Sequence, residues 1–591
     1  MPAAVRLSMP IRPRDALFGA LAALAAAAAY LPALGAGFTA DDWFVLARVR
    51  DHGGLANSFA YFGFAFFDYY RPLGFLSYAL DWELWGLNAF GFHMTSVALH
   101  AGNTALVYVL ARRLSGRGTA ALAAGLFGLH AGGHETVYWV AARFDLLATF
   151  LVLVALLLVT SDRRGLYLPG AAAFACALLA KESAAALPLI AAVWDAVVAR
   201  RSWVDVTRRA APLLVVGAAY VLLRSLGAGL AADGGRLPKL VLFIGSMTGL
   251  ILLTRAGVER VLRALVAARL PKAPLWVAIA GLVAAAAAMA PASSGFVLEK
   301  LGFIAYVVWV LASPWAFPPP PAWPFVPASV VQALPGLAAG LAAVGALWAG
   351  RAWLAARPAA LFAAWFAAAA LVPVLSMTGG TRYVYLASTG AAMLAAQVLE
   401  AAASRRPALV VVFVVAWLSV SGAQLFQAAS AWRWAGNLSR QAIDVMASDA
   451  PGCRSRTVVM VTAPVGLRGV YSNLLWEGLA VGSNCPPAAI VTLLRVVAAD
   501  AIVGVERPSL GRIDLRVPDY AGQFVASRDS RRYDVEVPAG ATMSVDTPLG
   551  RIDTWPEDDA QRFRVTLRSE AVGADYFAYS AGIMHAIGAG R

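Results

Sequence analysis

Long apolar runs constrain the fold of this chain more than any other feature. Three arginines lie in the first 15 residues, and an Ala/Leu-rich run then extends to about residue 36. A helix needs about 20 mostly apolar residues to cross the hydrocarbon core of a bilayer. This run is too long for the apolar region of a cleaved signal peptide. We therefore expect an uncleaved first span with its N-terminus in the cytoplasm, where Lys and Arg concentrate.

Similar runs recur along the chain and predict a multi-span α-helical membrane protein. Short Arg-containing segments separate many of them and mark cytoplasmic loops. After the first span, we predict spans at about 92–111, 119–133, 145–160, 166–181, 184–199, 210–227, 358–376, 384–403 and 408–430. Three middle stretches also resemble spans: 238–254, 273–290 and 300–316.

The predicted topology fixes the parity of the span count. An N-terminus inside and a C-terminus outside require an odd number of spans, and we predict about 13. One of the three middle stretches is expected to be re-entrant or interfacial, so an odd count of 13 requires one further span besides the runs named here. Residues 255–270 have an amphipathic helical pattern with Arg on one face, which predicts a helix lying flat on the membrane.

The charge of the chain follows from this topology. The net charge is +14, yet only 14% of the residues are charged and 60% are hydrophobic. Because Lys and Arg lie in short loops between apolar runs, they are explained by membrane orientation rather than by a nucleic-acid partner. The expected surroundings are membrane lipids, and the expected location is the cytoplasmic (inner) membrane.

The composition changes near residue 432. Charged residues become more frequent, and β-branched runs appear at 457–461, 489–498, 512–517, 533–537 and 562–567. We predict a membrane domain over 1–431 and a small extracytoplasmic domain over 432–591, either mixed α/β or mostly β. Cys453 and Cys485 lie in the second domain. They are expected to form a disulfide if that domain is outside, although two unpaired thiols are the alternative.

Unusual polar residues collect at the predicted outer ends of the spans. Such residues are costly in a membrane protein and commonly mark functional sites. Any one of them could be a snorkelling charge, but several outer ends carry them at a similar depth. They are Asp41, Asp42, Arg71, His134, Glu135, Arg143, Asp145, Lys181, Glu182, Arg382 and Tyr383.

Two adjacent carboxylates in FTADDWF (38–44) stand at the start of the first outer loop. A carboxylate can take a proton from an acceptor hydroxyl. Arg and Lys can hold a phosphate that is being displaced. The set therefore favours group transfer from a lipid phosphate at the outer face of the membrane.

Four segments resemble the membrane domain of the transmembrane, TPR-containing protein O-mannosyltransferases and their bacterial relatives, in the GT-C superfamily. They are residues 69–114, 129–150, 181–190 and 381–390, which occur in the family's order. The resemblance implies a polyprenyl-phosphate sugar as donor and covers about residues 15–435. The family's His-Pro-x-His-Thr-Glu turn is replaced here by His130-Ala-Gly-Gly-His134-Glu135, and its TPR repeats are absent.

The resemblance and the local chemistry together imply roles for these residues. Asp41 is predicted to be the general base, and Asp42 to orient it or to bind a cation. Arg71, Arg143, Lys181, Arg382 and Tyr383 are predicted to bind the donor phosphate, while His134, Glu135, Asp145 and Glu182 shape the sugar or acceptor side.

Other functions remain open at this point. His134 and Glu135 could instead hold a divalent metal ion. A transporter or lipid flippase would also have many spans and buried charges, although the polar groups here lie at one face and no internal repeat is visible. A degenerate relative acting as a scaffold is a third possibility. The sugar and the acceptor, whether protein, lipid or cell-envelope glycan, are not specified.

Overall fold

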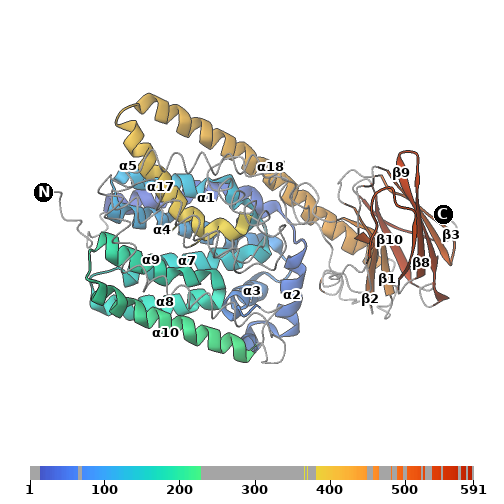
Figure 1. Ribbon diagram of the computed structural model, residues 1–591, viewed down its shortest axis with the longest axis horizontal. Helices are drawn as coiled ribbons and strands as arrows, with labels where there is room; N and C mark the ends of the chain where they lie inside the picture. Colours follow the sequence, from blue (N-terminus) through green and yellow to red (C-terminus); the bar gives the residue numbers. More distant parts are fainter. Residues whose placement is uncertain are drawn as a thin grey trace, which may run out of the picture.

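The computed structural model shows a helical part followed by two β-sheets (Figure 1). The described residues are 13–63, 69–227, 365, 369, 381–448, 457–464, 481, 489–496, 502–518, 520, 524–525, 535–547, 550–569, 574–580 and 583–588. The long helix α18 (Pro407–Ser448) runs from the helical part to the sheets (Figure 1).

The described residues of the helical part form helices, most of them joined by short turns, and the elements that follow are those of the described residues. Its other α-helices are α1 (Pro13–Tyr30), α2 (Asp41–Asp51), α3 (Pro72–Trp85), α4 (Ala89–Leu114), α5 (Arg117–Gly128), α6 (His134–Tyr138), α7 (Arg143–Val159), α8 (Tyr167–Ala180), α9 (Leu187–Val193), α10 (Trp203–Gly227) and α17 (Tyr385–Ala403). The turns are η1 (Leu31–Gly35), η2 (Gly54–Phe62), η3 (Ala131–Gly133), η4 (Val140–Ala142), η5 (Arg164–Leu166), η6 (Glu182–Ala186), the π-helical η7 (Trp194–Val198) and η8 (Thr381–Val384).

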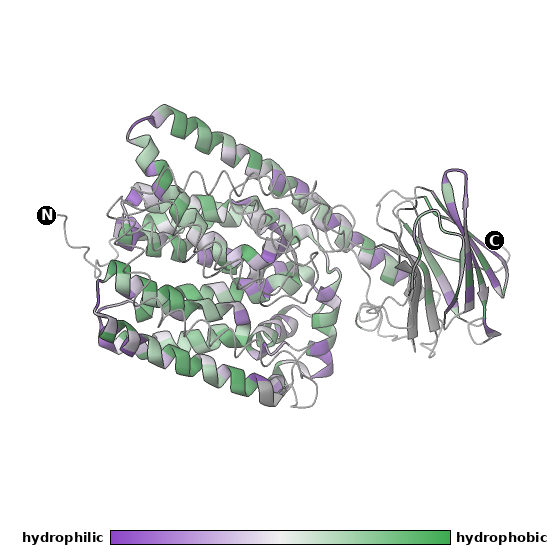
Figure 2. Cartoon of the chain, viewed as in Figure 1, coloured by the Kyte–Doolittle hydropathy of each residue, from purple (hydrophilic) through white to green (hydrophobic). Residues whose placement is uncertain are grey.

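Six helical segments in the described part are long and apolar enough to cross a membrane, and each overlaps a predicted span. They are Pro13–Gly35, Ala89–Leu114, Val140–Val159, Trp203–Arg224, Thr381–Ala403 and Pro407–Val445. Figure 2 shows hydrophobic residues along these helices and hydrophilic residues near many of their ends. The chain is therefore a multi-pass membrane protein.

The predicted count of about 13 spans is not confirmed. Helix α5 has 12 residues, so it is about 18 Å long at 1.5 Å per residue, shorter than the hydrocarbon core. The predicted span at 184–199 is divided between α9 and η7. The stretches 238–254, 255–270, 273–290 and 300–316 lie outside the described residues, as do both cysteines of the predicted disulfide.

The first outer loop, which lies between the predicted spans that end at about 36 and begin at about 92, is largely helical in its described residues. It contains α2, η2 and α3. In Figure 1, α2 and α3 lie at the end of the helical part that faces the sheets, which we call the sheet-facing end.

The C-terminal part contains the predicted β-structure. Its strands are β1 (Thr457–Pro464), β2 (Ala489–Val496), β3 (Gly504–Ser509), β4 (Arg512–Pro518), β5 (Phe524–Val525), β6 (Val535–Glu536), β7 (Met543–Thr547), β8 (Gly550–Glu557), β9 (Ala560–Leu567), β10 (Asp575–Ser580) and β11 (Ile583–Ala586). One sheet is mixed, in the order β11-β10-β1-β2-β5-β6, with β1 parallel to both β10 and β2. The other is antiparallel, in the order β3-β4-β9-β8-β7.

The antiparallel sheet follows from alternation along its strands. In β4, Ile513, Leu515 and Val517 are buried, whereas the residues between them are partly exposed. Ile513 pairs with Val565 of β9, and Val565 pairs with Ile552 of β8, so apolar residues form a row across one face. All five predicted runs contain a strand. Six strands lie outside these runs, because their sequences lack a long β-branched pattern: β3, β5, β7, β8, β10 and β11.

One hydrophobic cluster connects the sheets to the helical part. It contains Trp43 and Val49 of α2, Leu438 and Ile443 of α18, and buried residues of both sheets, such as Val565. Helix α18 continues through residue 431, where the membrane domain was predicted to end. The division into two domains remains a prediction.

Candidate active site

The two adjacent carboxylates lie at the start of α2 in different surroundings. Asp41 is exposed, whereas Asp42 is 1% exposed. The preceding residue, Ala40, has φ 48° and ψ −124°, a backbone conformation that favours glycine. Such strain is tolerated where surrounding contacts impose it, and it commonly occurs at functional sites.

Asp42 joins two loops through backbone hydrogen bonds. Its Oδ2 accepts from the Thr39 N–H (2.9 Å), and its Oδ1 accepts from the Ala141 N–H (2.6 Å). Burial raises the pKa of Asp42 well above its usual range, against the opposing effect of these two N–H groups, and the neighbouring Asp41 raises it further. Asp42 thus fixes the segment 35–43, which we call the acidic loop, on turn η4 and leaves Asp41 on the surface.

Turn η4 is also held from its other side. The Tyr78 hydroxyl donates to the Val140 carbonyl (2.8 Å), one residue before the N–H that Asp42 accepts. Tyr78 is fully buried in α3. The first outer loop and α3 therefore both hold η4, which immediately precedes Arg143.

Arg143 is enclosed within the protein. Its side chain is 0% exposed and forms an ion pair with Asp81 of α3 (2.6 Å). It also donates to the Phe92 carbonyl (2.7 Å), and its guanidinium lies 4.7 Å from the centre of the Tyr78 ring. Donor-phosphate binding by Arg143 stays a prediction, and the observed contacts favour a structural role, because the side chain is fully buried and paired with Asp81.

The other three predicted cations form a contiguous group around Tyr383, each paired with an acid. Lys181 Nζ donates to Asp145 Oδ2 (2.5 Å). Arg382 forms an ion pair with Glu135 and donates from Nη2 to the Tyr383 hydroxyl (2.9 Å). The Tyr383 ring centre lies 4.7 Å from Lys181 Nζ and 4.4 Å from the Arg382 guanidinium carbon.

Arg71 belongs to the same group. Its Nε and Nη2 donate to the two carboxylate oxygens of Glu182 at 3.0 and 2.5 Å, a bidentate pair. Its guanidinium carbon also lies 4.2 Å from the ring centre of Tyr69. Although burial opposes ionisation, Arg71 lowers the pKa of Glu182 to about 2, with a smaller contribution from Lys181. Both members of this pair are charged at neutral pH.

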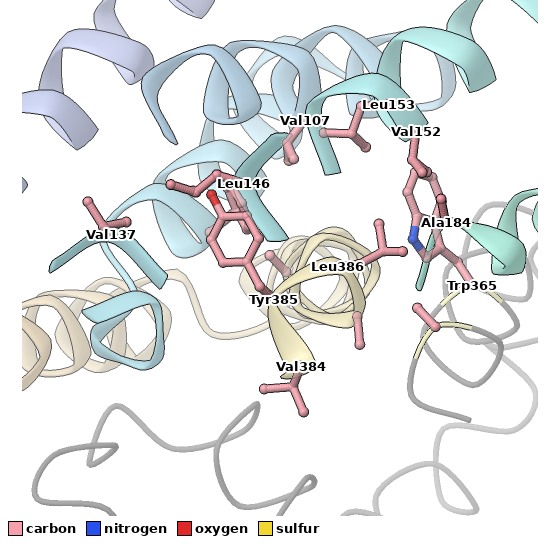
Figure 3. Close-up of a cluster of buried hydrophobic side chains, with 14 of the residues drawn as sticks. Val107, Val137, Leu146, Val152, Leu153, Ala184, Trp365, Val384, Tyr385 and Leu386 are labelled. Atoms are coloured by element: carbon pink, nitrogen blue, oxygen red, sulfur yellow. The ribbon is translucent and has the colours of Figure 1, made fainter. Parts of the chain in front are cut away.

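Buried contacts fix the segment that carries Arg382 and Tyr383. Two residues after Tyr383, the Tyr385 hydroxyl lies 2.6 Å from His100 Nδ1, and His100 Nε2 lies 3.0 Å from the Gly128 carbonyl. Because a carbonyl only accepts, Nε2 carries the proton and the Tyr385 hydroxyl donates to Nδ1. Figure 3 shows Tyr385 and Leu386 within a cluster of buried apolar side chains that includes Leu146.

His134 and Glu135 turn toward different partners. Trp432 Nε1 lies 3.3 Å from His134 Nδ1, whereas Glu135 accepts from the Arg382 N–H and the Thr381 hydroxyl, both at 3.1 Å. Burial lowers the pKa of His134 to about 4. Among the described residues, no group of three or more His, Cys, Asp or Glu side chains is arranged to hold a metal ion.

Two structural partners of the site had no predicted role. Asp81 is the counter-ion of Arg143, and Tyr69 lies beside Arg71. Both lie in segment 61–85, which the sequence shows to be rich in aromatic and acidic residues. The sequence did not show which cations they contact, because that depends on how α3 packs against the turn before α7.

Comparison with known proteins covers part of the chain. No protein-family profile matches it. An alignment of 215 residues, covering 33% of the chain, is 34% identical to protein O-mannosyl-transferase Tmtc2 of Drosophila melanogaster. Another of 142 residues, covering 22% of the chain, is 31% identical to human protein O-mannosyl-transferase TMTC2. The aligned part of the chain is homologous to the Tmtc protein O-mannosyl-transferases. This confirms the resemblance predicted from the motifs.

The chain spans less than a quarter of the length of these relatives, 23% of the fly protein and 17% of the human one. Among solved structures, oligosaccharyltransferase AglB from Archaeoglobus fulgidus has a TM-score of 0.45 and 13% identity, covering 81% of this chain and 64% of that chain. ArnT from Cupriavidus metallidurans, bound to undecaprenyl phosphate, has a TM-score of 0.35 and 17% identity, covering 80% and 85%. Neither structure assigns a ligand to this chain, because both TM-scores are below 0.5.

Proposed function

We propose that this protein is a membrane glycosyltransferase that moves a sugar from a polyprenyl-phosphate donor to an acceptor hydroxyl. The observation that carries the proposal is the arrangement of Asp41 and Asp42, in which a buried carboxylate fixes the loop that exposes its neighbour. The homology to protein O-mannosyl-transferases and the cationic group around Tyr383 support it.

The acid–base step is assigned to Asp41. The acceptor oxygen attacks the anomeric carbon of the sugar while Asp41 takes the hydroxyl proton. The bond between the sugar and the phosphate oxygen breaks, and the polyprenyl phosphate leaves with the electron pair. Asp42 is a positioning residue in this scheme, because both of its oxygens accept backbone N–H groups.

The leaving phosphate is assigned to Arg71, Lys181 and Arg382, with Tyr383 between the last two. Their acidic partners, Glu182, Asp145 and Glu135, hold each cation in one orientation before the donor arrives. Arg71 uses only Nε and Nη2 for Glu182, and Lys181 uses one of its three N–H groups for Asp145. The remaining donors provide hydrogen bonds for phosphate oxygens. Arg143 instead supports α3 and η4.

The acids define the rest of the site. Glu135, Asp145 and Glu182 act first as counter-ions for the three cations, and they flank the space where the sugar or acceptor binds. His134 lies behind Glu135, against Trp432.

The proposed location is the cytoplasmic membrane, with the site and the sheets outside. Loops carrying Arg112, Arg113, Arg200, Arg201 and Arg405 would face the cytoplasm. The cations of the site would be at the opposite membrane face, paired with acids. The acceptor is a hydroxyl of a protein, lipid or cell-envelope glycan.

Incubation with labelled lipid donors tests this proposal. Purified protein is given a panel of polyprenyl-phosphate sugars and a cell-envelope extract as acceptor source. Release of polyprenyl phosphate and appearance of a labelled product are both measured. Label that crosses a vesicle membrane without chemical change would instead indicate a transporter or flippase.

A further inference from the structure

The acidic loop lies along one face of helix α18. Three contacts follow one another at spacings of three residues on the helix: Gly35 against Arg433, Gly37 against Gly436, and Trp43 against Ser439. This spacing places all three helix positions on one side of α18. The loop and the helix are about 400 residues apart in the chain, as 396 residues separate Trp43 from Ser439.

The central contact brings two backbones together. A Cβ added to Gly436 would lie 2.5 Å from the Gly37 nitrogen and 2.6 Å from its Cα. Neither atom belongs to a side chain that could rotate away. Only glycine at 436 permits this approach, so a methyl group there would push the acidic loop away from the helix.

The third contact is a buried hydrogen bond. Trp43 Nε1 donates to Ser439 Oγ at 2.7 Å, and both residues are buried. Trp43 directly follows Asp42 in α2. The bond therefore fixes the first turn of α2, which exposes Asp41, at one place along α18.

The same helix extends toward the sheets. It has 42 residues, about 63 Å at 1.5 Å per residue, far more than the roughly 20 residues of a membrane span. Its buried residues Leu438, Ala442 and Ile443 share one hydrophobic cluster with Trp43 and with strands of both sheets. Positions 433, 436 and 439 all lie beyond the predicted end of the membrane domain at 431.

We propose that α18 positions the general base, so that Gly436 and Ser439 are positioning residues for the transfer reaction. The inference rests on the proposed function. The segment that leads to the C-terminal sheets is then part of the scaffold of the active site. Donor binding belongs to other elements, because Arg71, Lys181 and Arg382 lie outside α18.

Matched substitutions on the same helix provide the test. Gly436→Ala inserts a methyl group against Gly37, whereas Gly422→Ala inserts one where no atom of the described residues lies within 4 Å. Ser439→Ala removes the bond to Trp43, and Ser439→Thr keeps a hydroxyl. Ser430→Ala is the control for serine loss, because within the described part of the chain the exposed Ser430 hydroxyl donates to the Phe426 carbonyl of its own helix. Folding of each full-length variant is checked by size-exclusion chromatography and thermal unfolding.

The substitutions are expected to change kcat without changing the affinity for the donor. In Gly436→Ala, kcat should fall on the order of 10²-fold, since small displacements of a catalytic group cost about that much, while the Kd for the donor stays within about twofold. Ser439→Ala should lower kcat less, and Ser439→Thr should recover most of it. Gly422→Ala and Ser430→Ala should match the wild type. Wild-type kcat in a folded Gly436→Ala protein would overturn the inference.

A second readout does not require activity. Asp41→Cys is labelled with a maleimide, and the label at residue 41 is quantified by peptide mass spectrometry with and without Gly436→Ala. The inference predicts a several-fold change in labelling rate that Gly422→Ala does not produce, and equal rates in all three proteins would refute it. A wild-type protein without transferase activity would count against the proposed function alone.

Discussion

At the residue scale, burial separates two neighbouring carboxylates into two tasks. Asp41 is exposed at the first position of α2, and Asp42 is buried one residue later. The sequence predicted Asp41 as the general base and Asp42 as the residue that orients it or binds a cation, but it did not show that only Asp42 would be buried. The difference arises from turn η4, because its Ala141 N–H donates to the Asp42 carboxylate although the two residues are 99 positions apart in the chain.

Loss of Asp42 should therefore reduce stability as well as activity. Asp42→Ala leaves the N–H groups of Thr39 and Ala141 without their acceptor, and an unsatisfied buried donor costs about 1–3 kcal/mol. We expect a lower free energy of unfolding in detergent, measured by chemical denaturation. Exposed Asp41→Ala is the control and should unfold like the wild type. Equal stability of the two variants would contradict the conclusion that Asp42 holds the acidic loop against η4.

Arg143 gives a second test at this scale. Removing one partner of a buried ion pair typically costs about 3–5 kcal/mol. Arg143→Ala should therefore unfold more readily, because Asp81 remains buried without its cation. The double variant Arg143→Met/Asp81→Leu should regain much of that stability. If Arg143→Ala were fully stable and lost only donor affinity, the original phosphate-binding prediction would be restored.

At the element scale, helix α17 has cations at both ends with different surroundings. Arg382 precedes it and pairs with Glu135, whereas Arg405 follows it and is exposed. Arg382→Ala should weaken donor binding, while Arg405→Ala should leave it unchanged. Titration of each purified variant with a polyprenyl-phosphate sugar measures the two dissociation constants. Equal effects on affinity would place the phosphate elsewhere.

The contact between Arg71, just before α3, and Glu182, the first residue of η6, should respond to acid. Pairing with Arg71 lowers the pKa of Glu182 from 4.5 to about 2 in the folded protein. The stabilisation is therefore complete above pH 4.5 and is lost as the pH falls toward 2. Across this range, the unfolding temperature of the wild type should fall more steeply than that of Glu182→Gln. Parallel curves would show that the pair contributes no pH-dependent stability.

The sequence predicted elements better than it predicted their contacts. Apolar runs identified spans such as 92–111, and β-branched runs identified strands such as 512–517, because both patterns are local. The partners of the charges were not predicted, since Glu135 and Arg382 are 247 residues apart. The extension of α18 past 431 was missed because its polar residues there resemble the start of a soluble domain.

At the scale of the whole molecule, the membrane helices and the sheets meet at the acidic loop. The cluster that includes Trp43 and Ile443 continues into both sheets, and α18 contacts the loop at Gly436 and Ser439. The sheet-facing end of the helical part therefore carries the proposed base, the cations proposed to bind the phosphate and the attachment of the C-terminal part. This arrangement suits a reaction between a lipid in the membrane and an acceptor outside it.

Release of polyprenyl phosphate from a labelled polyprenyl-phosphate sugar, compared between purified wild type and Asp41→Asn, tests the central claim most directly. The substitution preserves side-chain volume and removes the base, so the wild type should transfer the sugar and the variant should be slower by about 10²–10⁴-fold. Both proteins should show the same unfolding temperature. Turnover by folded Asp41→Asn at the wild-type rate, or no release by the wild type from any donor in the panel, would contradict the account.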